Sequence, residues 1–127
     1  KLEGTWRVQV TIRDCQTGEA LQFPGNPFPA LVTFARGGTL TSADSTLLRS
    51  AGHGVWRHTG GHTYSAVSEA FLFNLAGVRT GTQRLTQVIE IGDDPDEFKA
   101  SVSAEILGRD GNLIQTACAT SVGRRME

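Results

Sequence analysis

The feature that most constrains this chain is a two-residue alternation of apolar and polar side chains that recurs along its length. In residues 5–14, TWRVQVTIRD, the apolar residues Trp6, Val8, Val10 and Ile12 occupy every second position. A period of two is typical of a β-strand with one buried face, because successive side chains of a strand point to opposite sides. The buried faces of such strands have to pack against one another, so the sequence predicts an all-β fold.

Turn-forming residues divide the rest of the chain into further short segments of the same character. Glycine-rich turns such as Arg36-Gly37-Gly38 and Gly60-Gly61 separate them, and no segment has a convincing amphipathic helical pattern. The eight predicted strands are residues 5–14, 30–35, 39–45, 53–59, 62–74, 81–91, 98–107 and 113–125. Eight consecutive strands without crossover helices form either an up-and-down barrel or a sandwich.

The lengths of the connections favour the barrel. Alternate connections of an up-and-down barrel lie at opposite ends, so the short turns at 36–38, 60–61 and 92–97 share one end with both termini. The longer connections, 16–29, 46–52, 74–81 and 108–112, share the other end, and the first of them carries Phe23 and Phe28 between prolines as a candidate apolar lid. We therefore expect an eight-stranded antiparallel meander barrel that forms a single domain over residues 1–127.

The charge of the chain argues against several classes of partner. Its formal net charge is −1 and its arginines are scattered, so it lacks the basic surface that binds nucleic acid. No apolar run approaches the roughly 20 residues needed to cross a bilayer. We expect neither a nucleic-acid partner nor a membrane span. The sequence indicates no cofactor and leaves the oligomeric state open.

The start of the first strand, Gly4-Thr5-Trp6, together with eight meandering strands and an arginine near the end of the last one, resembles the calycin superfamily, the lipocalins and their small bacterial relatives. The stretch GHGVWRHTGGHTYSA, residues 52–66, is also similar to the central hairpin of uncharacterised bacterial proteins of the lipocalin-like group. The resemblance implies that Trp6 plugs the closed end of the barrel and that Arg124, with Arg125 next to it, packs across the tryptophan ring. The C-terminal helix of ordinary lipocalins has no counterpart here, nor has the helical lid of the fatty-acid-binding branch.

The two cysteines, Cys15 and Cys118, lie near opposite ends of the chain. If the first strand pairs antiparallel with the last, a disulfide between them and the contact between Trp6 and Arg124 require nearly the same register. We therefore expect a disulfide, which would place the protein in the periplasm or outside the cell, with a signal peptide already removed. Two buried, reduced thiols are the alternative.

All three histidines lie within residues 51–66, around a Gly-Gly turn. With a two-residue turn, His58 faces Thr63 and points to the opposite face from His53 and His62; with a three-residue loop, His58 lies opposite His62. Neither register assembles the three or four ligands that zinc requires, since no Cys, Asp or Glu is near enough, and Glu69 would lie too far along its strand. We interpret the stretch as a structural hairpin and the acidic run GDDPDE as a turn rather than a calcium loop, and we predict no metal site and no catalytic residue.

The barrel interior is the candidate binding site, because an eight-stranded barrel is just wide enough either to be filled by side chains or to hold one small ligand. Small residues on the seventh strand, Ala100 and Ala104, leave room beside larger apolar ones. The predicted cavity residues are Val8, Val10, Ile12, Phe28, Phe34, Trp56, Tyr64, Leu85, Gln87, Ile89 and Val102. A core filled by the same side chains is the alternative.

A hollow barrel of this kind would bind a small apolar molecule, which is the function we expect. A second hypothesis is a barrel enzyme of the cyclase or isomerase type that acts on a lipid-like substrate, with Gln87 and Tyr64 as the polar groups of its pocket. A third hypothesis is an interaction protein with a solid core that acts through its surface. A cavity, a buried ionisable group within it and a large exposed apolar patch distinguish the three.

Overall fold

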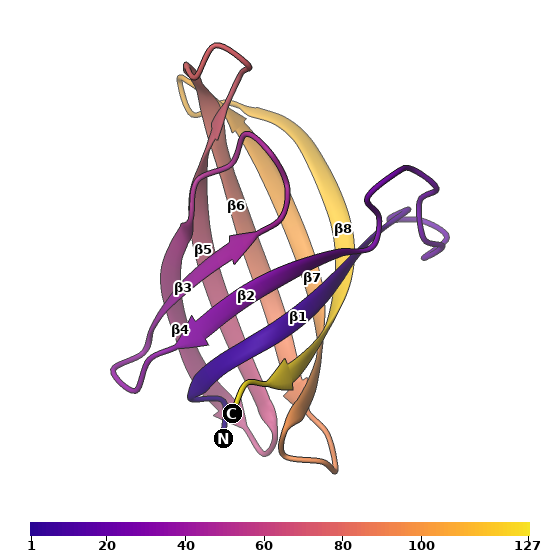
Figure 1. The fold of residues 1–127 in the computed structure, drawn as a ribbon, viewed down its shortest axis with the longest axis vertical. Coiled ribbons are helices and arrows are strands. Elements are labelled where there is room, and N and C mark those ends of the chain that lie inside the picture. Colours follow the sequence, from indigo (N-terminus) through magenta and orange to yellow (C-terminus); the bar gives the residue numbers. More distant parts are fainter.

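The computed structural model describes residues 1–127 as eight β-strands without a helix. The strands are β1 (Gly4–Arg13), β2 (Phe28–Phe34), β3 (Thr39–Asp44), β4 (Gly52–Gly60), β5 (Thr63–Phe73), β6 (Arg79–Ile91), β7 (Glu97–Gly108) and β8 (Leu113–Arg125). Each strand pairs antiparallel with its neighbours in the sequence, and β1 also pairs with β8, so the sheet closes into a barrel (Figure 1). The prediction of a closed eight-stranded meander barrel is confirmed, and the sandwich is excluded.

The two ends of the barrel differ as the connection lengths predict. Both termini and the short turns after β2, β4 and β6 lie at the lower end in Figure 1. The connections between β3 and β4, β5 and β6, and β7 and β8 lie at the upper end. We call these the closed end and the open end.

The connection between β1 and β2 differs from the expected lid. Asn26 fastens it to the end of β1, since the Asn26 side chain accepts from the Ile12 N–H at 2.9 Å and donates to the Ile12 carbonyl at 3.0 Å. Phe28 belongs to β2 and faces the interior, whereas Phe23 lies in the loop, is 43% exposed and does not line the cavity described below. Only the second of the two phenylalanines is therefore placed to touch a molecule in the barrel.

Inward-facing positions follow the period of two along each strand. On β1, Trp6 and Val8 are buried, whereas Arg7 and Gln9 are exposed. The sequence alone does not show which face of β5 points inward, because its large apolar residues stand at both even and odd positions, as Tyr64 and Phe71 do. The structure resolves this: the inward face of β5 carries Tyr64, Ala66, Ser68 and Ala70. The larger Phe71 points outward and is 54% exposed, and the only irregularity against β6 lies at Leu72/Phe73.

The densest part of the core fills the closed end. Trp6, Leu2 and Ile89 are completely buried there. The Trp6 and Phe98 rings lie 4.8 Å apart between centroids, and Phe34 meets the Phe98 ring edge-on at 6.4 Å. Such pairs add about 0.5–1.5 kcal/mol each beyond the area they bury. The closed end is thus a packed aromatic plug, and any internal space has to lie above it.

Candidate functional site

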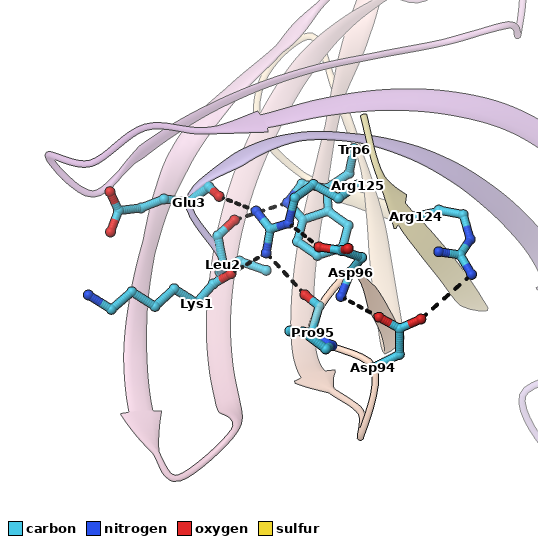
Figure 2. Close-up of polar contacts among 9 residues, drawn as sticks. All are labelled: Lys1, Leu2, Glu3, Trp6, Asp94, Pro95, Asp96, Arg124 and Arg125. Atoms are coloured by element: carbon cyan, nitrogen blue, oxygen red, sulfur yellow. Dashed lines mark hydrogen bonds and ion pairs between the residues drawn. The ribbon is translucent and has the colours of Figure 1, made fainter. Parts of the chain in front are cut away.

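Arg125 stabilises the aromatic plug at the closed end of the barrel. Its guanidinium carbon lies 4.3 Å from the centre of the Trp6 ring, within the range of a cation–π contact (Figure 2). The same guanidinium donates hydrogen bonds to the carbonyl oxygens of Lys1, Glu3 and Pro95 and to a carboxylate oxygen of Asp96. One side chain from β8 therefore joins the N-terminal segment to the turn that precedes β7.

The prediction that Arg124 packs across the Trp6 ring is wrong. The register of β1 against β8 pairs Trp6 with Arg125. Arg124 points outward, its side chain is 60% exposed, and it forms an ion pair with Glu97. A second ion pair joins Arg124 to Asp94 (Figure 2). Because neighbouring residues of a strand face opposite sides, an error of one residue in the register exchanges the two arginines.

A disulfide lies near the other end of the same pair of strands. Cys15 and Cys118 are bonded, with their Cα atoms 5.2 Å apart, so the expected disulfide is present in the structure. The paired part of β1 ends where Arg13 faces Cys118, and Cys15 lies just beyond it. The contact between β1 and β8 is therefore fastened at both ends, by Arg125 and by the disulfide.

Above the plug the barrel encloses a cavity of about 360 Å³. This volume lies within the range of about 300–1,000 Å³ that is typical of small-molecule sites. Of the 24 residues that line it, 17 are hydrophobic. The interior is hollow because the inward positions of β7 and β8 are mostly small: Ala104 faces Ala117 across the two strands, and Val102 faces Ala119.

Most of the predicted cavity residues lie in this wall. They are Val8, Val10, Ile12, Phe28, Phe34, Leu85, Gln87 and Val102. The structure does not place the other three, Trp56, Tyr64 and Ile89, in the wall. Trp56 and Tyr64 pack against each other toward the closed end, with ring centroids 5.9 Å apart, and Ile89 is completely buried. These three side chains belong to the packed core and do not line the space available to a ligand.

Sequence reasoning missed a further set of lining residues. Those on strands share the inward parity of the predicted residues, and the alternation extended to β2, β3 and β8 and along the whole of β7 would have found them. They include Ala30, Val32, Ser42, Asp44, Phe98, Ile106, Gln115, Ala117, Ala119 and Ser121. Arg49 lies in the connection between β3 and β4, where no periodicity exists to indicate its direction.

Arg49 and Asp44 form a buried ion pair in the cavity wall. Their side chains are only 6% and 14% exposed, and Arg49 Nη1 lies 3.4 Å from Asp44 Oδ2. Arg49 Nε donates to Gln83 Oε1 at 2.8 Å, and Nη1 donates to the Ser50 carbonyl at 3.3 Å. This group connects the end of β3 to β6 and is the one ion pair among the residues that line the apolar cavity.

The histidine hairpin adopts neither of the two expected registers. His58 pairs with Tyr64, and the irregularity between His58 and Gly60 absorbs the difference. His58 Nε2 lies 2.7 Å from the Gly61 carbonyl oxygen, and the His58 ring packs on Tyr64 with centroids 4.9 Å apart. His53 faces Glu69, which lies directly opposite rather than far along its strand. No group of three or more His, Cys, Asp or Glu side chains is placed to hold a metal ion.

One carboxyl group has a perturbed acidity. Asp14 accepts hydrogen bonds from the backbone N–H groups of Thr17 and Gln16 at 3.0 and 2.8 Å. These bonds favour the ionised form and lower the pKa of Asp14 below its ordinary value, the contribution of Thr17 being the largest. Asp14 lies in the turn after β1, so this effect belongs to the loop and not to the cavity.

Comparison of the chain with family models, with curated proteins and with solved structures found no match. Among the elements of the fold, no helix is suited to crossing a membrane.

Proposed function

We propose that this protein is a calycin-like barrel that binds one small, largely apolar molecule in its interior. The observation that carries the proposal is the cavity of about 360 Å³ inside the barrel, with its 17 hydrophobic lining residues. Burial of apolar ligand surface in such a site contributes about 25 cal/mol per Å², so a small apolar molecule would bind there without further specific contacts.

The closed end supports the calycin assignment. The resemblance implies a tryptophan plug in the first strand with a basic side chain from the last strand across its ring. Trp6 and Arg125 have this arrangement. The disulfide between Cys15 and Cys118 supports an oxidising location, the periplasm or the cell exterior, because such bonds persist there.

The cavity favours binding over the two other hypotheses. The interaction-protein hypothesis assumes a core filled by side chains, and the barrel instead contains a cavity. A cyclase or isomerase with Gln87 and Tyr64 in its pocket needs both groups beside the substrate, yet only Gln87 lines the cavity. The buried ion pair of Arg49 and Asp44 is better suited to recognition, since each charge is already occupied by the other.

Native mass spectrometry of the protein purified from its host, followed by a denaturing run, tests the proposal. A small mass released on denaturation is the expected result. The variant Ala104→Phe places a large ring in the cavity and should lose the ligand. Ser103→Phe, one residue away on the exposed face of β7, should retain it. Equal occupancy of both variants would show that the cavity is not the binding site.

A further inference from the structure

Four of the polar side chains that line the cavity form one connected group, apart from Gln87, Gln115 and Ser121 elsewhere in the wall. Ser42 and Asp44 lie on the inward face of β3, Arg49 follows in the next connection, and Gln83 lies near the start of β6. Gly52 makes this grouping compact, because a Cβ at Gly52 would lie only 2.5 Å from Ser42 Oγ and 3.1 Å from Arg49 Nη2. The Ser42 hydroxyl and the Arg49 guanidinium therefore both lie close to Gly52, which has no side chain to keep them apart.

The nitrogen groups of Arg49 and Gln83 that make no hydrogen bond within the chain are donors. Arg49 uses Nε and Nη1 within the chain, and Nη2 makes no hydrogen bond. Gln83 uses its oxygen to accept from Arg49, which leaves its NH₂ group free. Ser42 Oγ also has no partner, but it has no exposed surface that a ligand in the cavity could touch. A ligand oxygen placed beside Arg49 Nη2 and the Gln83 NH₂ group would accept from both donors, and the bond to the charged guanidinium would be the stronger of the two.

The charge of the group determines which kind of oxygen fits. Asp44 already neutralises Arg49, and both side chains are largely removed from water. A carboxylate on the ligand would bring the total charge of the group to −1 inside an apolar enclosure, and burying an uncompensated charge is expensive. A neutral acceptor such as a carbonyl oxygen satisfies the donors without adding charge.

We propose that Arg49 and Gln83 form an anchor for a neutral hydrogen-bond acceptor, so that the cavity takes an uncharged amphipathic molecule, a carbonyl group joined to an apolar body, in preference to a carboxylate. This inference rests on the proposed function, since it assumes that the cavity holds a ligand. It assigns Asp44 a specific part: the Asp44 carboxylate excludes anionic ligands.

Three probes of equal carbon number test the anchor: 2-undecanone, undecanoate and undecane, each measured by displacement of a neutral fluorescent apolar dye at neutral pH. In the wild type, 2-undecanone should bind at least about tenfold more tightly than undecanoate, the equivalent of one charge-assisted hydrogen bond. In Asp44→Asn, where Arg49 loses its counter-ion, undecanoate should gain about tenfold or more while undecane is unchanged. The control Glu69→Gln removes one negative charge from the outer face, where Glu69 pairs with Arg84, and should leave all three affinities unchanged.

The variant Gln83→Met removes the NH₂ donor of Gln83, together with the oxygen that accepts from Arg49 Nε, at nearly constant volume. It should weaken 2-undecanone about fivefold and leave undecane unaffected, since only the ketone uses the donor. Undecanoate binding as tightly as 2-undecanone to the wild type would overturn the anchor while leaving the cavity proposal intact. Failure of the dye and of all three probes to bind would overturn both. If Asp44→Asn does not fold, the comparison of 2-undecanone with undecanoate in the wild type still tests the proposal.

Discussion

Replacing Arg125 with leucine should destabilise the barrel far more than the same change at Arg124. Arg125 donates three hydrogen bonds to backbone carbonyls, each worth about 1 kcal/mol net, and its cation–π contact with Trp6 adds about 1 kcal/mol. The half-exposed ion pair with Asp96 adds at most about 1 kcal/mol. Leucine recovers about 1 kcal/mol by packing on the ring, and the contributions are not fully additive, so we expect a loss of about 3 kcal/mol.

Arg124 provides the matched control. It lies next in the chain, and its ion pairs with Glu97 and Asp94 are exposed to solvent, so Arg124→Leu should lose only about 0.5 kcal/mol. Urea unfolding measured by tryptophan fluorescence distinguishes the two variants. With a slope of about 2 kcal/mol per molar urea, the midpoint should fall by about 1.5 M for Arg125→Leu and by about 0.25 M for Arg124→Leu. Losses that agree within about 0.5 kcal/mol would refute the assignment of Arg125 as the closing residue.

Three other perturbations have defined outcomes. The double variant Cys15→Ala, Cys118→Ala opens a loop whose ends are separated by 103 residues and should lose about 4.7 kcal/mol by loop-closure entropy; a loss below about 1 kcal/mol in urea unfolding would contradict this account. Gly52→Ala forces a methyl group against Ser42 Oγ and should cost about 1–3 kcal/mol in the same assay, whereas Gly37→Ala, with no atom near its Cβ position, should be neutral. Asp14 should titrate in NMR below the ordinary value of 3.8, and, since its pKa is lower in the folded state, its stabilising effect should be complete above the unfolded value and vanish as the pH falls through the folded one. A midpoint at or above 3.8 would contradict the hydrogen bonds from Thr17 and Gln16.

The order of the strands could be predicted from sequence because alternation and turn residues are local properties. On β1 the pattern of Trp6, Val8 and Val10 identifies the inward face without any tertiary information. Register could not be predicted with the same accuracy. The pairing of β4 with β5 depends on how the backbone passes Thr59 and Gly60, and a single irregular residue there changed the partner of His58.

The residues of the cavity wall also divide into those that the sequence could predict and those that it could not. Positions such as Ala117 and Ala119 follow from parity once β8 is recognised, and the predicted residues on β1, β6 and β7 lie beside them. Arg49 could not be found, because its direction is set by contacts with Asp44 and Gln83, which are distant from one another in sequence. The group that gives the cavity its chemical character thus depends on tertiary structure and not on pattern.

The meander order also determines how the barrel assembles in time. Seven of the eight strand pairs join segments that follow one another in the chain, so each forms by the closure of a local connection, the longest of which joins β1 to β2. Only β1 with β8 brings residues more than a hundred positions apart into contact. Because the rate of folding falls as contacting residues become more distant in sequence, we expect the pairing of the first and last strands to limit the rate at which the barrel closes.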